Sequence, residues 1–288
     1  KNKDEVPIKD FRKECREFAK EWINIHINEF KRLGVTGDFQ NYYSTMSFAA
    51  EAQIVRELGK FLLDGSLYQG FKPVFWSTVE KTALADAEVE YQDHTSNTIF
   101  VAFKVKESPK NFLKDSNIII WTTTPWTIPA NKALAFNSNI EYALVEISDL
   151  ENFKEKNIVV AKNLLDSIVK SCAIEKFKIL KTFSGSEFTG TICKHPFEKL
   201  NYSFDVPMLE ARFVTLEQGT GIVHCAPSHG PDDFNLCLKH NIPSKYTIDN
   251  AGYYTDEIPF FTKTHVFKAD PIVIDKLKEV KKLLKNDK

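Results

Sequence analysis

The chain of 288 residues carries 38 basic and 39 acidic side chains, so its formal net charge is only −1. That balance excludes the global basic field of a dedicated duplex-binding protein. Hydrophobic residues make up 43% of the chain, which is ordinary for a globular protein of one large or two modest domains. No apolar run reaches membrane-spanning length, the first residues do not form a signal peptide, and the five cysteines lack CxxC spacing. These features predict a cytoplasmic protein with reduced thiols that binds no membrane.

The first two predicted elements are amphipathic helices. Apolar residues recur every three or four positions over residues 8–33, and this pattern ends near Gly34. A second such pattern runs over 48–62 and stops around Gly65. We therefore expect residues 1–69 to form a helical hairpin that packs on another surface.

From Gly70 onward the pattern changes to short strands separated by turns. Strands are predicted at 72–76, 88–93, 98–105, 117–121, 132–137, 142–147, 157–161, 177–183 and 221–226. Short helices are predicted around 162–170 and after Pro231.

The last segment, 267–288, predicts a single returning helix. Asp270 is placed as its N-cap with Pro271 at the first helical position, and an apolar stripe continues to Leu284. The predicted fold class is α+β: a β-rich, barrel-like domain with short helices at 70–266, flanked by helical connecting segments at 1–69 and 267–288.

The stretch "IIIWTTTPWTIPAN", residues 118–131, places three adjacent threonines where a buried strand breaks into a loop. Ile118, Ile119 and Ile120 predict the strand, and Pro125 and Pro129 stop it. On the residues alone, Trp126 could also be a core aromatic, and Thr127 and Asn131 could be turn residues.

A second stretch, "GTGIVHCAPSHGPDDF" at 219–234, also calls for a functional explanation. Gly219 and Gly221 allow a sharp turn or a close approach of the backbone to a ligand. Asp232 and Asp233 fall in the first turn of a helix, where carboxylates interact favourably with the helix dipole.

Three functional interpretations of these stretches remain open. A metal site could use His224, His229, Asp232 and Asp233, although their spacing matches no familiar metal motif. A serine hydrolase could use Ser228, although the chain lacks a G-x-S-x-G elbow there. In the third, threonine hydroxyls and a carboxylate orient a substrate and a water without a protein nucleophile. Only this last interpretation uses both stretches.

Together with "KPVFWSTVEKTALADAEVEY" at 72–91, the two stretches resemble the editing domain inserted in the class I synthetases for Ile, Val and Leu. The second stretch is most similar to the isoleucyl type. The resemblance implies that Thr122, Thr123 and Thr124 position the terminal adenosine, the ester and the attacking water. It also implies that Asp233 holds the α-ammonium of the substrate. The remaining substrate-binding residues implied are Trp126, Thr127, Asn131, Gly219, Gly221 and His224.

The resemblance further implies a monomer that hydrolyses Val-tRNA(Ile), with valyl-adenylate as an additional candidate substrate. Its expected partners are the Val-bearing 3′ acceptor end of tRNA(Ile) and the catalytic domain of a parent synthetase. No cofactor and no metal are expected, because Ser77 and Glu80 stand where many relatives carry a zinc-binding CxxC. The HIGH and KMSKS motifs of amino-acid activation do not occur in these residues.

Two alternatives to this function are retained. One is a valyl-type domain that hydrolyses Thr-tRNA(Val), which requires a buried hydrogen-bond partner for the threonine hydroxyl. The other is a non-catalytic module that binds the acceptor end of tRNA.

Overall fold

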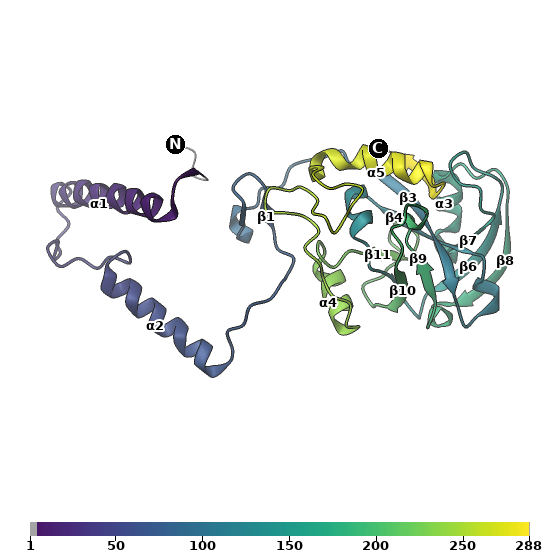
Figure 1. The fold of residues 1–288 in the computed structure, drawn as a ribbon, viewed down its shortest axis with the longest axis horizontal. Coiled ribbons are helices and arrows are strands. Elements are labelled where there is room, and N and C mark those ends of the chain that lie inside the picture. The colour runs from purple at the N-terminus through teal and green to yellow at the C-terminus, as the bar shows by residue number, and fades with distance from the viewer. Residues whose placement is uncertain (1–4, 288) are drawn as a thin grey trace. The chain divides into compact units, whose positions relative to one another are not determined.

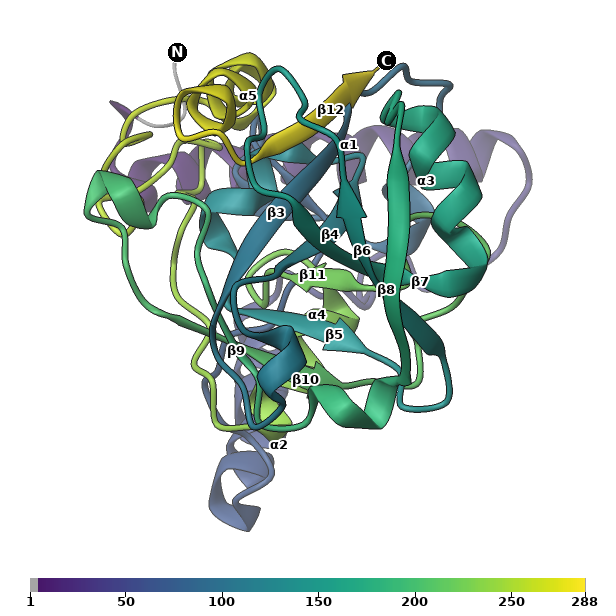
Figure 2. The same ribbon diagram turned by 90° about the vertical axis from the view of Figure 1, so that its right-hand side faces the viewer.

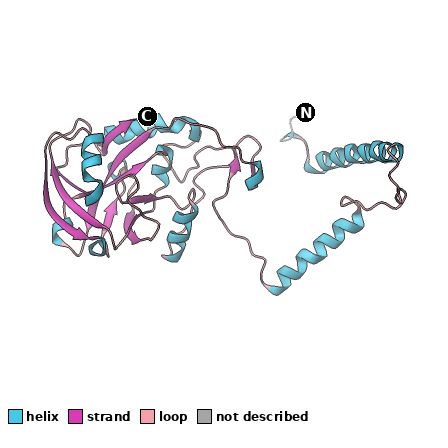
Figure 3. Cartoon of the chain, turned by 180° about the vertical axis from the view of Figure 1, so that it is seen from behind, coloured by secondary structure: helices cyan, strands magenta, loops and turns pink. Residues whose placement is uncertain are grey.

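The computed structural model describes residues 5–287, which fall into two compact units, Lys1–Gly70 and Phe71–Lys288. Within the described residues, strands occur only in the second unit, which we call the sheet unit (Figure 3). No helix in this part of the chain is both long and apolar enough to cross a bilayer.

The N-terminal unit consists of the two predicted helices, α1 (Ile8–Arg32) and α2 (Phe48–Asp64). Helix α2 begins where the Ser47 hydroxyl accepts a hydrogen bond from the Ala50 N–H, and it ends at Gly65, which adopts the left-handed conformation. Both helices are therefore confirmed close to their predicted limits. Neither contains a buried residue, so their apolar faces remain exposed.

The sheet unit contains a small two-stranded sheet and a ten-stranded mixed sheet (Figure 1). The two-stranded sheet pairs β1 (Trp76–Ser77) with β2 (Thr82–Ala83). The strands of the large sheet are β3 (Thr98–Glu107), β4 (Asn117–Thr122), β5 (Ala133–Phe136), β6 (Glu141–Ile147), β7 (Asn157–Ala161), β8 (Phe177–Ser184), β9 (Ile192–Lys194), β10 (Asp205–Glu210), β11 (Val223–Cys225) and β12 (Leu283–Asp287).

The large sheet runs in the order β11-β5-β10-β9-β3-β4-β7-β6-β8, with β12 paired to β3 beside this path. Strand β11 also contacts β4, so the sheet curls back on itself in the manner expected of a barrel-like fold. The short helices of this unit are α3 (Leu165–Ser171), α4 (Pro231–Lys239) and α5 (Ala269–Glu279).

Strand alternation distributes the core over both faces of the sheet. Ile118 and Ile120 lie in one buried cluster with Ile99 and Val101, while Ile119 lies in a second cluster. The second cluster includes buried residues of α3, which runs alongside the sheet (Figure 2). The predicted buried strand is therefore confirmed, and Thr122 continues the face of Ile118 and Ile120.

Some predicted strands are absent and some observed strands were not predicted. Residues 88–93 form no strand, and of 72–76 only Trp76 is part of one. Strands β9 and β10 were not predicted, because β9 is only three residues long and β10 contains Pro207; besides pairing with each other, they pair with the distant strands β3 and β5.

The single C-terminal helix predicted for 267–288 is wrong. Helix α5 ends at Glu279, Lys281 adopts a positive φ, and Leu283–Asp287 pair with β3 as strand β12. The N-cap assignment of Asp270 is also wrong, because the 3-10 helix η8 (Val266–Lys268) leads directly into α5 and places Asp270 in its first turn. Tertiary pairing with β3 overrides the helical period of the lysine-rich segment.

Candidate functional site

The predicted threonine segment is the turn by which β4 leaves the sheet. The Thr122 hydroxyl accepts a hydrogen bond from the Thr124 N–H at 3.1 Å, and Pro125 then starts the 3-10 helix η4 (Pro125–Ala130). The side-chain hydroxyls of Thr123 and Thr124 form no hydrogen bond with any residue in 5–287. Thr123 is exposed and Thr124 half-buried, so both hydroxyls are accessible to a ligand.

His224 joins the two sequence motifs. Its Nε2 lies 2.9 Å from the Thr127 hydroxyl, and its Nδ1 lies 3.2 Å from Asn131 Nδ2. Strand β11 supplies His224 and pairs antiparallel with β5, which begins two residues after Asn131. This register explains why residues nearly one hundred positions apart meet here.

The hydrogen bonds around His224 determine its tautomer. The Thr127 hydroxyl donates its proton to the Thr124 carbonyl at 2.9 Å, so it acts as the acceptor toward His224. His224 therefore carries its proton on Nε2 and accepts from Asn131 at Nδ1. Burial, with a smaller contribution from nearby His229, lowers the pKa of His224 to about 4. The ring is consequently neutral near pH 7, and both of its nitrogens are already engaged in hydrogen bonds.

Asn131 is fully buried and only partly satisfied. Its Nδ2 also donates to the Ala133 carbonyl at 2.9 Å, whereas its Oδ1 is the one buried side-chain polar atom in residues 5–287 without a hydrogen-bond partner. An unpaired buried acceptor is costly, and Oδ1 is enclosed by the protein in this structure.

Asp233 lies at the start of α4, and its carboxylate is partly engaged. Oδ2 accepts a hydrogen bond from the Ala226 N–H at 2.9 Å, and a Cβ on Gly230 would lie only 2.7 Å from it. No residue in the described chain bonds to Oδ1. The pKa of Asp233 is raised to about 6. Burial is the main cause and the charge of Asp232 adds to it, while the hydrogen bond from Ala226 acts in the opposite direction. Such a carboxylate gains from a cationic ligand. Asp232, by contrast, is exposed.

Trp126 is held by residues that sequence reasoning did not connect with the site. Its backbone N–H donates to Asp270 Oδ1 at 3.1 Å, and its carbonyl accepts a hydrogen bond from the Tyr254 hydroxyl. The indole meets the His229 ring edge-to-face at 4.8 Å between centroids. Tyr254 and Asp270 follow Trp126 by more than one hundred residues, and no sequence spacing signals their role. The metal-site interpretation names His229 as a ligand, and in the structure its Nε2 lies 3.1 Å from the Thr247 hydroxyl.

Gly219 and Gly221 are explained by packing of the backbone. Both have a positive φ, and a Cβ on Gly221 would lie 2.4 Å from the Ala161 Cβ. The nearest side chain to a Cβ on Gly219 would be Trp121, which directly precedes Thr122 in β4. The role of these two glycines in substrate binding stays a prediction.

The remaining interpretations find little support in the geometry. No three His, Cys, Asp or Glu side chains within 5–287 are grouped as a metal site would need. The Ser228 hydroxyl lies 3.1 Å from Ser244 and 2.6 Å from the Lys245 carbonyl, with no histidine as its partner. Two measured clefts, of about 210 and 400 Å³, contain none of the predicted site residues.

Comparison with known proteins assigns the family. A model of the class I tRNA synthetases (I, L, M and V) matches residues 1–285, and the chain belongs to this family. The isoleucine–tRNA ligase of Pelagibacter ubique is 66% identical over 286 residues, covering 99% of this chain and 32% of that protein. The isoleucine–tRNA ligase of Gluconobacter oxydans is 45% identical over 293 residues, covering 100% of this chain and 30% of that protein.

The chain thus spans about a third of the length of the curated relatives it matches. Among solved structures, the cytosolic leucyl-tRNA synthetase editing domain of P. knowlesi aligns with a TM-score of 0.48 and 13% identity. That alignment covers 65% of this chain and 94% of the other, and it is too distant to bear on the site.

Proposed function

We propose that the sheet unit is an editing hydrolase that removes valine from Val-tRNA(Ile) as part of an isoleucine–tRNA ligase, with valyl-adenylate as an additional substrate. The observation that carries the proposal is the convergence of the two motifs at His224. Near it, the accessible hydroxyls of Thr123 and Thr124 and the unpaired Oδ1 of Asp233 supply ligand-binding groups without a protein nucleophile.

In this proposal, Asp233 Oδ1 binds the α-ammonium of the aminoacyl group, because a partly desolvated carboxylate needs a cation. The threonine hydroxyls orient the terminal ribose and a water molecule. Water adds to the ester carbonyl, the bond to the ribose oxygen breaks, and that oxygen leaves with a proton, giving free valine and tRNA. Positioning suffices for this step, because the aminoacyl ester is already activated.

The substrate choice follows from size. One methylene distinguishes isoleucine from valine and is worth only about 1–3 kcal/mol in a hydrophobic pocket, and isoleucyl-tRNA synthetase is the standard example of that limit. A second site that admits only the smaller side chain can hydrolyse the valyl product that the first, synthetic site fails to reject. We assign the exclusion of isoleucine to Trp126, whose backbone is fixed at both ends and whose indole packs against His229.

One observation favours the alternative substrate, Thr-tRNA(Val). The unpaired Asn131 Oδ1 is the type of buried acceptor that would reward a threonine hydroxyl. The Asn131→Ala variant separates the two assignments, since it should weaken hydrolysis of a Thr ester much more than that of a Val ester only if Oδ1 contacts the side chain.

The test uses the full chain with Val-tRNA(Ile), Ile-tRNA(Ile) and Thr-tRNA(Val), with release of the labelled amino acid as the readout. We expect Val release to exceed Ile release at least about tenfold, the value of a methylene, and to persist after exhaustive chelation. Equal release of Val and Ile would refute size exclusion. Binding of tRNA without turnover would favour the non-catalytic module.

We further infer that α1 and α2 pack against the catalytic domain of the parent synthetase. Phe18, Trp22 and Leu62 are 63%, 44% and 62% exposed, which leaves apolar stripes without a cover in the described residues. The chain covers about a third of the length of its relatives. The rest of such a protein can therefore supply the surface that covers these apolar stripes.

A further inference from the structure

One edge of β3 is shared by two strands, and a cleft opens between them. Strand β12 pairs with Thr98–Val101 and β9 pairs with Val105 and Glu107, so the interval around 102–104 has no strand along this edge. Lys282 immediately precedes β12, and its carbonyl accepts a hydrogen bond from the Ala102 N–H at 2.9 Å. The cleft at this junction has a volume of about 210 Å³.

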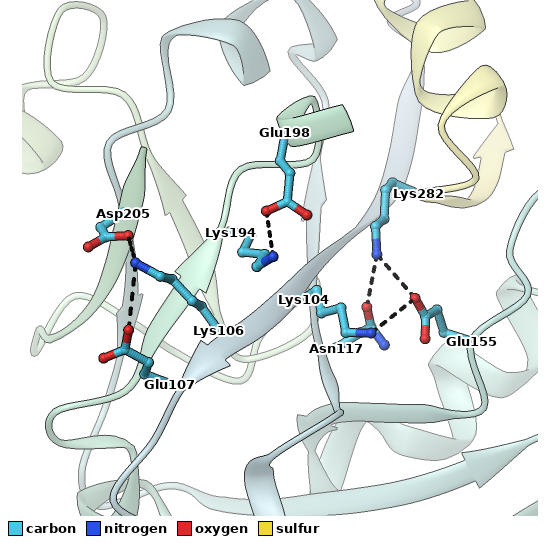
Figure 4. A network of polar contacts seen from close by, with 9 residues as sticks. All are labelled: Lys104, Lys106, Glu107, Asn117, Glu155, Lys194, Glu198, Asp205 and Lys282. Carbon is cyan, nitrogen blue, oxygen red and sulfur yellow. Dashed lines mark hydrogen bonds and ion pairs between the residues drawn. The ribbon is translucent and has the colours of Figure 1, made fainter. Parts of the chain in front are cut away.

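The lining of this cleft is positively charged (Figure 4). Four lysines and two glutamates line it, together with His195 and Pro196: Lys104, Lys194, Lys199, Lys282, Glu155 and Glu198. Burial lowers the pKa of His195 to about 3, so the imidazole adds no charge near pH 7. The lining therefore carries an excess of two positive charges.

The two glutamates do not compensate the four lysines evenly. Glu198 pairs with Lys194 at 2.8 Å, while a single Glu155 oxygen lies 3.7 Å from Lys104 and 3.6 Å from Lys282. Lys199 is exposed and has no ion-pair partner within residues 5–287.

Lys282 is the most buried of the four lysines and is incompletely paired. Its side chain is only 9% exposed, yet its ammonium forms one hydrogen bond, a long one of 3.3 Å to Asn117 Oδ1. An ammonium has three N–H donors, and a buried charge without full compensation is costly. Burial lowers the pKa of Lys282, Lys104 and Lys199 lower it further, and Glu155 raises it. One long hydrogen bond and one ion pair at 3.6 Å therefore leave the Lys282 ammonium with unused hydrogen-bonding capacity.

We propose that this cleft binds a phosphate group, with Lys282 at its base and Lys104 and Lys199 at its rim. Phosphate oxygens accept several charge-assisted hydrogen bonds at once, which supplies the missing partners of the Lys282 ammonium. At about 30 Å³ per water, the cleft holds about seven waters, enough for a phosphate with part of its hydration shell. None of the proposed editing residues lines the cleft, so this inference is independent of the hydrolysis proposed above.

The test titrates inorganic phosphate into the full chain, with chloride at equal ionic strength as reference, and follows the ammonium signals of isotope-labelled lysine by NMR. We expect saturable shifts at Lys282. Lys199→Gln should weaken phosphate binding about fivefold or more, the effect of one unit charge at contact distance. Lys106→Gln is the matched control, because Lys106 lies on β3 two residues from Lys104 but pairs with Asp205 at 2.6 Å outside the cleft.

A parallel titration with a short RNA duplex distinguishes the source of the phosphate. If the duplex shifts Lys282 and inorganic phosphate competes only weakly, the ligand is an RNA phosphodiester. If inorganic phosphate binds and the duplex does not, the ligand is a small phosphate compound. Two results would overturn the proposal: no shift at Lys282 with either probe, or equal weakening by Lys199→Gln and Lys106→Gln.

Discussion

The two units of the chain use hydrophobic patterning to different ends. In α1 and α2 an amphipathic pattern forms regular helices that bury no residue. In β3 and β4 a nearly continuous apolar run places successive side chains in two clusters on opposite faces, and Ile99, Ile119 and Ile120 have no exposed surface. A hydrophobic period therefore predicts the element, whereas the stability of that element depends on whether the described chain also supplies the surface that covers it.

Amide hydrogen exchange should show the largest difference. We expect amides of β3 and β4 to exchange at least about a thousandfold more slowly than those of α1 and α2 in the full chain, because helices without tertiary packing open locally at little cost. The short β1–β2 pair serves as a reference for weakly protected strands. Equal protection in the helices and the central strands would contradict the comparison.

Asp233 tests whether the proposed activity belongs to the sheet unit. Asp233→Asn should lower kcat/KM for Val-tRNA(Ile) about a hundredfold or more, as expected for losing a partly buried ion pair worth about 3–5 kcal/mol. The amide oxygen can still accept the Ala226 N–H, so the thermal midpoint should change little. Asp232→Asn, at an exposed neighbouring position, is the control and should retain most of the activity.

Replacing one apolar side chain in each unit sharpens the comparison. Ile120→Ala should lower the free energy of unfolding by about 2–5 kcal/mol, because Ile120 is fully buried. Leu62→Ala in α2 should change it by less than about 0.5 kcal/mol, since Leu62 is 62% exposed. Urea unfolding followed by circular dichroism measures both. A large cost for Leu62→Ala would show that α2 is packed within this chain.

Histidine burial gives the sheet unit its own pH dependence. His224 has a folded pKa of about 4, below its ordinary 6.5, so it contributes stability that is present above pH 6.5 and lost as pH falls toward 4. Between pH 7 and 5, His224→Gln should remove about 2 kcal/mol of the observed loss of stability. Asp233 acts oppositely in this range, because its raised pKa favours the folded state as pH falls from about 6. Urea unfolding at both pH values tests the sign and the size.

Tyr254 is expected to have the smallest effect. Tyr254→Phe removes the hydroxyl that donates to the Trp126 carbonyl and should cost about 1 kcal/mol of stability. It should also reduce the preference for Val over Ile by a few-fold if Trp126 sets the size limit. Tyr253→Phe is a matched control, since Tyr253 is 42% exposed. Unchanged selectivity in Tyr254→Phe would show that the Tyr254 hydroxyl does not help to position Trp126 for the size limit.

Local sequence patterns were sufficient where a single segment determines the structure. The helix limits near Gly34 and Gly65 and the buried strand at Ile118–Ile120 are confirmed, because each depends on caps, periodicity or branched side chains within one segment. The helix predicted through Leu284 is wrong, because pairing with β3 cannot be read from the local period.

The site shows the same limit. The motifs identified His224, Asn131 and Asp233 as candidates, but the tautomer of His224 depends on a contact with Thr127 across the fold. Likewise, the hydrogen bonds that link Asp270 and Tyr254 to the Trp126 backbone connect residues whose spacing in the sequence gives no sign of contact. Contacts of this kind arise from the topology of the sheet, so they could be assigned only from the structure.

The pairing of β12 with β3 also has a consequence for protein engineering. Asp287 lies directly opposite Thr98 in an antiparallel ladder, so the first and last residues of the large sheet are neighbours across one pair of strands. A two-residue hairpin turn is enough to join such ends. The sheet is therefore suited to circular permutation, with new termini opened in a surface loop, and to transplantation into a host loop whose two ends lie one strand spacing apart.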